Sequence, residues 1–416
     1  MLSLDDVDLT DLELFADGPP SRAYQLLRDQ APVHWNRPTE HTPGGEGFWS
    51  LTRHADVEWA AKHPELFSSE GGGPREGGGT LIEDLPRGFA AGVLLNMTDG
   101  PRHHAVRRLV TPSVSPKRLR EIESLLAQRC ATIVDDALAR GTVDFLVDIA
   151  AELPLQAIAS LLGVSQDDRH FFLEWADTTL DYDDRDPGEF SERTQQASAK
   201  LFEYSAGLFA EKRRCPGDDI SSIIATAELP PEAGPGGPLS ELEQQMFFSL
   251  LVAAGSETTR NSIAGGVLAL MERPDDWEAL RADRSLLPAA IEEILRWISA
   301  TIYNRRTATQ DVELHGTTIR AGDKVVLWWQ AANFDERVFD EPGRFDIRRS
   351  PKPQLSFGIG SHFCLGSNLA RVEIRLVLEQ LLDSVASIEL AGPIERTRSN
   401  KHAGYRHMPV TLTPLV

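Results

Sequence analysis

Apolar residues recur every three or four positions over long stretches of the chain, which is the spacing of amphipathic helices. The clearest stretch is SPKRLREIESLLAQRCATIVDDALARG, Ser115–Gly141, where Gly141 is the expected C-terminal cap. The helical pattern extends over most of Pro101–Ser165, and SNLARVEIRLVLEQLL after Gly366 repeats it. These segments predict that helices dominate the fold.

Strand-like alternation is confined to short segments. A strand is predicted near Phe48–Thr52, followed by a helix that begins at about Ala55. After Arg306 the sequence VELHGTTIRAGDKVVLWW alternates between apolar and polar residues around turns at His315–Gly316 and Ala321–Gly322.

Strands and helices do not alternate in the βαβ order of a parallel sheet. We therefore predict a mainly α fold with small β-sheets. It forms one domain over residues 1–416, in which the β-rich part comes from approximately residues 30–70 and 305–330. Glycine dominates Ser68–Thr80, and acidic residues dominate Leu180–Arg193, so both are predicted to be mobile loops.

The longest predicted helix follows Ser240. Ser240 and Glu243 form a capping box, and the sequence is then apolar on nearly every side until Pro274. At 1.5 Å per residue such a helix would be about 50 Å long and buried at the centre of the domain. It is not a transmembrane span, because GSETTRN interrupts the apolar run before it reaches membrane length.

That polar interruption has two interpretations. Glu257, Thr258 and Thr259 follow Gly255, a residue that weakens helices. Hydroxyl groups that bond back to the preceding turn would produce a local kink. Alternatively, the polar groups handle protons at a ligand for which glycine leaves room. Helix position alone does not separate the two.

Charge and cysteine content narrow the class of protein. Lys+Arg total 42 and Asp+Glu total 63, a net charge of −21, which disfavours nucleic acid or an anionic membrane as the main partner. Cys130, Cys215 and Cys364 are odd in number and widely spaced, so a reducing cytoplasm is expected. The acidic start MLSLDDVDLTDLELFADGPP has neither the basic n-region nor the apolar h-region of a signal peptide, and no membrane anchor is expected.

Cys364 lies among glycines in FGIGSHFCLG, Phe357–Gly366, just before a predicted helix. A thiolate is a soft metal ligand, and backbone N–H groups at a helix start would stabilise it. Glycines permit a large group to lie close to the backbone. The alternatives are an inert buried cysteine and a zinc site with His362, although no further His/Cys pair lies nearby to complete four zinc ligands.

FGIGSHFCLG resembles the haem-binding loop of the cytochrome P450 family, FxxGx(H/R)xCxG, without insertion or deletion. Three further motifs agree with that family in their order. They are AGSETT (Ala254–Thr259) for AGx(D/E)TT, EEILR with Glu293 and Arg296 for ExxR, and FDEPGRF with Pro342, Arg344 and Phe345 for PxRF. The resemblance covers essentially the whole chain.

The resemblance implies haem b as cofactor, with Cys364 as the axial thiolate and metal ligand. It implies that the segment DGPRHHAVRR clasps the haem. The residues expected to hold the haem propionates are His103, Arg107, Arg306 and His362, and those expected to contact the rest of the haem are Ala254, Gly255, Phe357, Gly358 and Gly366.

The resemblance also assigns roles beyond haem binding. Glu257 and Thr258 resemble the catalytic acid–alcohol pair that delivers protons to dioxygen. A buried structural ion network is expected from Glu293, Arg296 and Arg344, and breaking it should cost ~3–5 kcal/mol. The substrate pocket is expected to include Met97, Ala253, Ile302 and Tyr303, with the segment from Ser68 to Met97 and Leu180–Arg193 lining or covering it.

The implied activity is that of a haem-thiolate monooxygenase. It would insert one atom of O2 into a C–H bond of a bulky apolar substrate, with electrons from an NAD(P)H-dependent ferredoxin reductase and ferredoxin. Arg371 and Arg375, with Arg107 and Arg108, are expected to form a basic docking face for that ferredoxin. The sequence style is similar to members that hydroxylate steroid side chains and terpenoids, but Ala300 replaces their usual proline after the ExxR helix. A peroxide-driven peroxygenase and a non-catalytic haem-binding gas sensor are the alternatives.

Overall fold

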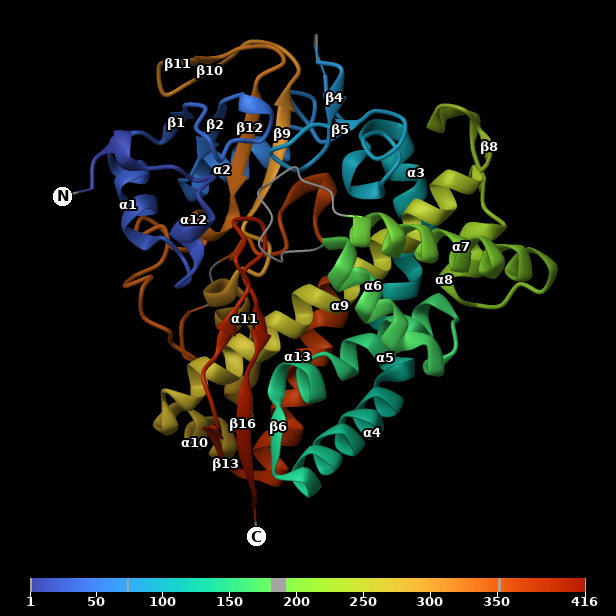
Figure 1. The fold of residues 1–416 in the computed structure, drawn as a ribbon, viewed down its shortest axis with the longest axis vertical. Coiled ribbons are helices and arrows are strands. Elements are labelled where there is room, and N and C mark those ends of the chain that lie inside the picture. Colours follow the sequence, from blue (N-terminus) through green and yellow to red (C-terminus); the bar gives the residue numbers. More distant parts are fainter. Residues whose placement is uncertain (1, 73–74, 181–191, 351–352, 416) are drawn as a thin grey trace.

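A computed structural model describes residues 2–72, 75–180, 192–350 and 353–415 (Figure 1). Helices predominate, as predicted. Their bounds are α1 Ser21–Gln30, α2 His54–Lys62, α3 Gly100–Val110, α4 Pro116–Arg140, α5 Glu152–Leu162, α6 Arg169–Leu180, α7 Glu192–Arg214, α8 Ile220–Ala225, α9 Glu241–Met271, α10 Pro274–Ala282, α11 Leu287–Ile298, α12 Trp329–Asn333 and α13 Ser367–Ser384.

The strands are short and form small sheets. A five-stranded sheet has the order β1-β2-β12-β9-β3, with β12 parallel to β2 and the other neighbours antiparallel. A three-stranded sheet has the order β13-β16-β6, and the remaining strands pair two by two. The bounds are β1 Val33–Asn36, β2 Phe48–Leu51, β3 Phe67–Ser68, β4 Gly77–Gly78, β5 Leu85–Pro86, β6 Thr142–Asp144, β7 Glu228–Leu229, β8 Gly237–Pro238, β9 Tyr303–Ala308, β10 Val312–Leu314, β11 Thr317–Ile319, β12 Lys324–Trp328, β13 Val385–Leu390, β14 Glu395–Arg396, β15 Tyr405–His407 and β16 Pro409–Pro414.

Several local predictions are confirmed. Gly141 caps α4 with a φ of 76°, and Ser240 begins α9 with both hydrogen bonds of the capping box. The predicted turn at His315–Gly316 joins β10 to β11, with both residues at positive φ. The predicted connection Leu180–Arg193 falls mainly on residues 181–191, which lie outside the described residues.

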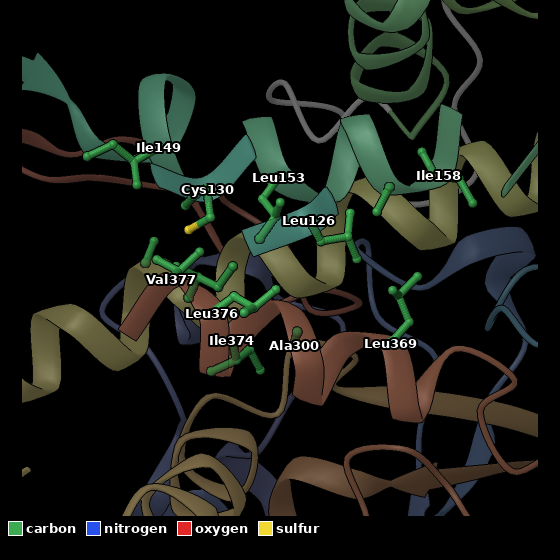
Figure 2. Close-up of a cluster of buried hydrophobic side chains, with 14 of the residues drawn as sticks. Leu126, Cys130, Ile149, Leu153, Ile158, Ala300, Leu369, Ile374, Leu376 and Val377 are labelled. Atoms are coloured by element: carbon green, nitrogen blue, oxygen red, sulfur yellow. The ribbon is translucent and has the colours of Figure 1, made fainter. Parts of the chain in front are cut away.

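Helix α9, 31 residues long, crosses the centre of the molecule (Figure 1). It packs against α5, α6, α7, α11 and α13. Figure 2 shows part of the surrounding core, where α4, α5 and α13 bring their apolar side chains together. Cys130 lies in this cluster, and burial raises the pKa of its thiol to about 12, so Cys130 is a packing residue. Within the described ranges, no helix is long and apolar enough to cross a lipid bilayer.

A buried ion network fixes the end of α11 to the loop that follows α12. Arg296 donates two hydrogen bonds of 2.7 Å to the Glu293 carboxylate and others to the carbonyls of Asn333 and Pro342. The prediction that Arg344 completes this network is wrong. The Arg344 side chain is 60% exposed and pairs with Glu341 and Asp346.

Arg349 takes the place predicted for Arg344. Its Nε lies 2.9 Å from Glu293 Oε2, and its side chain is only 11% exposed. Arg349 also donates to the backbone carbonyls of Asp340 and Arg344 at 2.6 Å. Arg344 therefore contributes its carbonyl oxygen to the network, and Arg349 contributes the second cation.

Candidate active site

The loop before α13 is closed by backbone contacts that need glycine. Gly358 and Gly360 have positive φ, and a Cβ on Gly360 would lie 2.7 Å from the carbonyl oxygen of Ala61. The Cys364 N–H donates to the Phe357 carbonyl at 2.8 Å, which closes the loop. The loop therefore presents Cys364 just ahead of the first turn of α13.

A cavity of about 230 Å³ separates this loop from the middle of α9. A Cβ placed on Gly366 would meet no protein atom within 4 Å, so the space over the loop is open. Predicted residues from two distant motifs, together with Arg306, meet around this cavity. They are Ala254, Gly255, Thr258, Arg306, Phe357, Gly358, His362, Cys364 and Gly366. Gly255 has a second role, because a Cβ there would lie 3.1 Å from the Ile158 side chain on α5.

The residues predicted for the substrate pocket do not line this cavity. In strand β9 side chains alternate, so Asn304 and Arg306 face the cavity while Tyr303 packs against Trp328 on the other side. Ile302 lines a different cavity. The prediction is therefore wrong for Ile302 and Tyr303, and the wall is formed instead by Ala300, Thr301 and Asn304.

The other two predicted pocket residues are close neighbours of lining residues. Met97 is buried with its sulfur against Gly79, while Asn96 faces the cavity. Ala253 precedes the lining residue Ala254 on α9, about 100° away around the helix.

Ala300 stands where the resembled group of proteins usually has a proline, and hydrogen bonds hold the chain just before it. Ser299 adopts a left-handed conformation, φ 46°, and is fully buried. Its hydroxyl donates to the Arg296 carbonyl and accepts from the Asn333 amide, both at 2.8 Å. This hydroxyl directs the chain into residues 300–304.

Basic side chains gather at one end of the cavity. Burial lowers the pKa of Arg306 to about 10, and the Asp99 carboxylate opposes the shift. Burial, together with the neighbouring His362 and Arg107, lowers the pKa of His103 to about 3. The His103 ring lies 4.3 Å from that of His362, and its buried Nδ1 has no hydrogen-bond partner in the part of the chain that the structure describes. His103 and Arg107 do not line the cavity itself, although Arg107 donates to the Phe363 carbonyl at 2.6 Å.

Asp99 is a member of this cluster to which the sequence motifs gave no role of its own. Burial alone would raise its pKa, but hydrogen bonds from His362 and Ser68 outweigh burial and lower the pKa to about 2. His362 Nε2 lies 3.1 Å from Asp99 Oδ1. The Asp99 carboxylate thus interacts with Arg306, His103 and His362, a donor set that suits a further anionic group.

Comparison with known proteins identifies the family. The sequence profile described as Cytochrome P450 matches residues 83–386. The chain belongs to the cytochrome P450 family. It is 46% identical to cytochrome P450 126 of Mycobacterium tuberculosis, over 98% of both chains.

Relatives with named activities are more distant. A methyl-branched lipid omega-hydroxylase of M. tuberculosis is 37% identical, covering 98% of this chain and 94% of that one. A steroid C26-monooxygenase of the same organism is 35% identical, covering 98% and 92%. Among solved structures, Mycobacterium marinum cytochrome P450 CYP268A2 in complex with pseudoionone has a TM-score of 0.88 and 34% identity over 99% of both chains.

Membership makes this chain a haem-thiolate monooxygenase, and the residues present fit the cofactor. The cavity offers one cysteine sulfur, an open glycine surface and, at one end, cationic groups for two carboxylates. Burial raises the pKa of the Cys364 thiol, although the N–H groups of Gly366 and Ser367 and the nearby Arg107 oppose this. The N–H groups at the helix start therefore favour the thiolate, as predicted, but they do not outweigh burial. A metal cation, by contrast, deprotonates a coordinating thiol.

The polar part of α9 remains helical in this P450. The hydroxyls of Ser256, Thr258 and Ser262 donate to carbonyls four residues earlier, at 2.8, 3.1 and 2.8 Å, and the α-helix continues without a break from Glu241 to Met271. Thr258 faces the cavity, whereas Glu257 is only 3% exposed and lies 3.4 Å from the ring of His402. The back-bonding hydroxyls of the first interpretation are therefore present, although they do not break the helix. Thr258 also lies in the cavity wall, where the second interpretation needs it.

Glu373 on α13 is a cavity residue that the sequence analysis missed. It is buried, and its Oε1 has no hydrogen-bond partner within the described residues. Burial raises the pKa of Glu373 to about 8, with a hydrogen bond to Thr259 opposing the shift. A signal was available, since Glu373 stands in the apolar stripe that includes Leu369, Ile374 and Val377.

Proposed function

We propose that this cytochrome P450 inserts one oxygen atom of O2 into a C–H bond of a bulky apolar substrate of steroid or terpenoid type. The observation that carries the proposal is the cavity that brings Cys364 and Thr258 to facing walls. Haem iron supplies the oxygen-activating chemistry when it is bound. The chain supplies the ligand, the anion partners and the proton donors.

Cys364 is the proposed iron ligand. Arg306 and His362 line the cavity and are proposed to bind the propionates, with His103 and Arg107 directly behind them. Burial of Arg306 supports this role, because a buried guanidinium is stable only beside an anion.

Thr258 and Glu257 are the proposed proton-delivery residues. The Thr258 hydroxyl lies in the cavity wall and donates to the Ala254 carbonyl at 3.1 Å. Cleavage of the O–O bond needs two protons in a site with little water, and an alcohol beside a buried carboxylate can transfer them. Peroxide would bring these protons itself, so this pair favours use of O2 over a peroxygenase reaction.

An apolar substrate is supported by the cavity wall and by relatives. Leu295, Ala300 and Leu369 supply apolar surface, and Asn304 and Thr301 supply polar groups beside it. The named relatives act on a steroid and on methyl-branched lipids, and the similar solved structure holds pseudoionone.

The proposed electron donor is an acidic ferredoxin, reduced by an NAD(P)H-dependent reductase. His104, Arg107 and Arg108 line an open surface hollow of about 440 Å³ next to the Cys364 loop. The other two predicted docking residues are ion-paired within the chain, Arg371 with Glu292 and Arg375 with Glu123 and Glu379. The hollow is therefore the main basic surface proposed for docking.

A cytoplasmic location is also proposed, because Cys130, Cys215 and Cys364 are all unpaired. The proposed function is tested by titrating the haem-loaded protein with sterols, terpenoids and fatty acids. A sterol or terpenoid should shift the ferric haem from low to high spin and then be hydroxylated when ferredoxin, reductase and NAD(P)H are added. A protein that binds carbon monoxide but consumes no NAD(P)H with any of these compounds would instead be a sensor, and the proposal would be abandoned.

A further inference from the structure

A second cavity, of about 290 Å³, lies along the C-terminal half of α9. Its walls include the exposed residues Asp17, Glu272 and Arg396, so it opens to solvent, and the buried polar residues Gln330 and Ser399. Because a water molecule occupies about 30 Å³ in the liquid, a polar cavity of this size holds several. The haem-site assignment gives this cavity no role.

One face of α9 leads from this cavity to the proposed catalytic acid. Glu257, Asn261, Gly265 and Leu268 follow one another at intervals of four, four and three residues and therefore share a face. Gly265 and Leu268 line the second cavity. Glu257 lies at the other end of the same face, next to Thr258 in the wall of the haem cavity.

The segment 399–405 is fixed against this face. The Ala403 N–H donates to the Ala300 carbonyl and the Ile302 N–H donates to the Lys401 carbonyl, both at 2.9 Å. The Tyr405 N–H donates to Asn261 Oδ1 at 3.2 Å, and a Cβ on Gly404 would lie 2.5 Å from the Asn261 amide nitrogen. The segment therefore packs directly on α9, one helical turn from Glu257.

His402 is the residue of this segment that touches both places. It lines the second cavity, and its Nδ1 lies 3.4 Å from Glu257 Oε2 while its side chain is 14% exposed. A histidine has two ring nitrogens and can accept a proton at one and release a proton at the other. Contacts at this length often shorten in the working complex.

We propose that His402 passes protons from water in the second cavity to Glu257, and so supplies the Glu257–Thr258 pair. The ring takes a proton from water at one nitrogen and gives the Nδ1 proton to the Glu257 carboxylate, so no other reactant is needed. The inference rests on the proposed function, since it gives Glu257 its proton source. His402 acts through Glu257 and is not in contact with the reacting atoms.

The test compares two substitutions in the haem-loaded protein. His402→Phe removes both ring nitrogens, and His402→Gln can still hydrogen-bond to Glu257 but cannot carry a proton. The substrate is the sterol or terpenoid that gives the largest spin shift. In both variants a smaller fraction of the electrons taken from NAD(P)H should end in hydroxylated product than in the wild-type protein. The expected fall is about ten-fold, which is below the roughly 10²–10⁴-fold range for a group in direct contact with the reacting atoms, because His402 acts through Glu257. The rate should also decrease more in D2O than the wild-type rate does. Product formation driven by hydrogen peroxide, which brings its own protons, should be unchanged.

A matched control is His407→Gln, because His407 also pairs with a carboxylate, Asp144 at 2.7 Å, but lies on the surface. It should behave like wild type. If His402→Gln keeps the wild-type share of electrons in product, His402 only positions Glu257 and the relay is overturned. The same conclusion follows if His402→Phe keeps it.

Two further results bear on the cavity. Ala269 lies in the α9 wall of the second cavity, and Ala269→Phe, which would fill that cavity, should lower the electron share as the His402 variants do. An unchanged share overturns the route. A crystal structure of the haem-loaded protein should show ordered water within hydrogen-bond distance of the His402 ring, and a dry cavity also overturns the route.

Glu257→Gln separates the two proposals. If Glu257→Gln lowers the share and the His402 variants do not, only this inference fails; if Glu257→Gln changes nothing, the proposed role of Glu257 fails as well.

Discussion

Replacing Arg349 by methionine removes a guanidinium from the buried network while keeping a side chain of similar length. The lost contacts are the 2.9 Å bond to the Glu293 carboxylate and the two 2.6 Å bonds to the carbonyls of Asp340 and Arg344. Glu293 keeps both hydrogen bonds from Arg296 and accepts a third from the Asp346 N–H. The cost should therefore be smaller than the ~3–5 kcal/mol for a stranded buried charge. The two carbonyl bonds are exposed, so water can replace them. The loss should therefore be that of one hydrogen bond to a charged group, about 1.5–3 kcal/mol.

The matched control is Arg344→Met, which removes the arginine that the PxRF-like motif first suggests. Its ion pairs with Glu341 and Asp346 are exposed, at 3.3 and 3.2 Å, and such pairs contribute about 0–1 kcal/mol. Urea unfolding followed by circular dichroism measures both variants, at equal haem content because bound haem stabilises the folded state. An Arg344 variant that loses as much stability as the Arg349 variant would refute the reasoning.

Three further outcomes are expected. Thr258→Ala should retain haem and the substrate-induced spin shift but divert electrons to peroxide or water, and unchanged coupling of NAD(P)H use to product would count against the proton role. Cys364→Ser should lose the red-shifted Soret band of the reduced carbon monoxide complex, whereas a retained band would show that another residue binds the iron. Burial raises the pKa of Glu373 from 4.5 to about 8, so the folded state keeps a proton that the unfolded chain releases, and stability should fall as pH rises through this range. Glu373→Gln should flatten that fall in unfolding measurements between pH 4.5 and 8, and an equally steep dependence would mean that Glu373 is ionised throughout.

Helices and motifs were accessible from sequence because their signals are local. The capping box at Ser240 and the cap at Gly141 involve residues within one helical turn, and the haem-loop glycines lie within one short stretch of the chain. The mainly α fold with small sheets followed from these patterns and is confirmed by the P450 relatives.

The wrong or missing predictions concern residues whose positions are set by contacts with residues distant in the sequence. Arg344 and Arg349 are five residues apart in a stretch between α12 and α13 that has little regular structure, and only the folded loop shows which one reaches Glu293. The side of β9 that faces the cavity depends on its pairing with β12, so Tyr303 and Asn304 could not be assigned from alternation alone. His402 lies 145 positions beyond Glu257 in the numbering of the chain, without a motif of its own.

The left-handed turn at Ser299 limits how this enzyme can acquire new substrates. The hydroxyl that holds the turn is anchored to Arg296 and Asn333, and Arg296 is also the centre of the buried ion network. Reshaping the wall at residues 300–304 would therefore disturb the stability of the whole protein. In natural variation or directed evolution of substrate range, substitutions should therefore accumulate first in walls that are not tied to the ion network, such as the stretch around Asn96. Substitutions at residues 300–304 should come last.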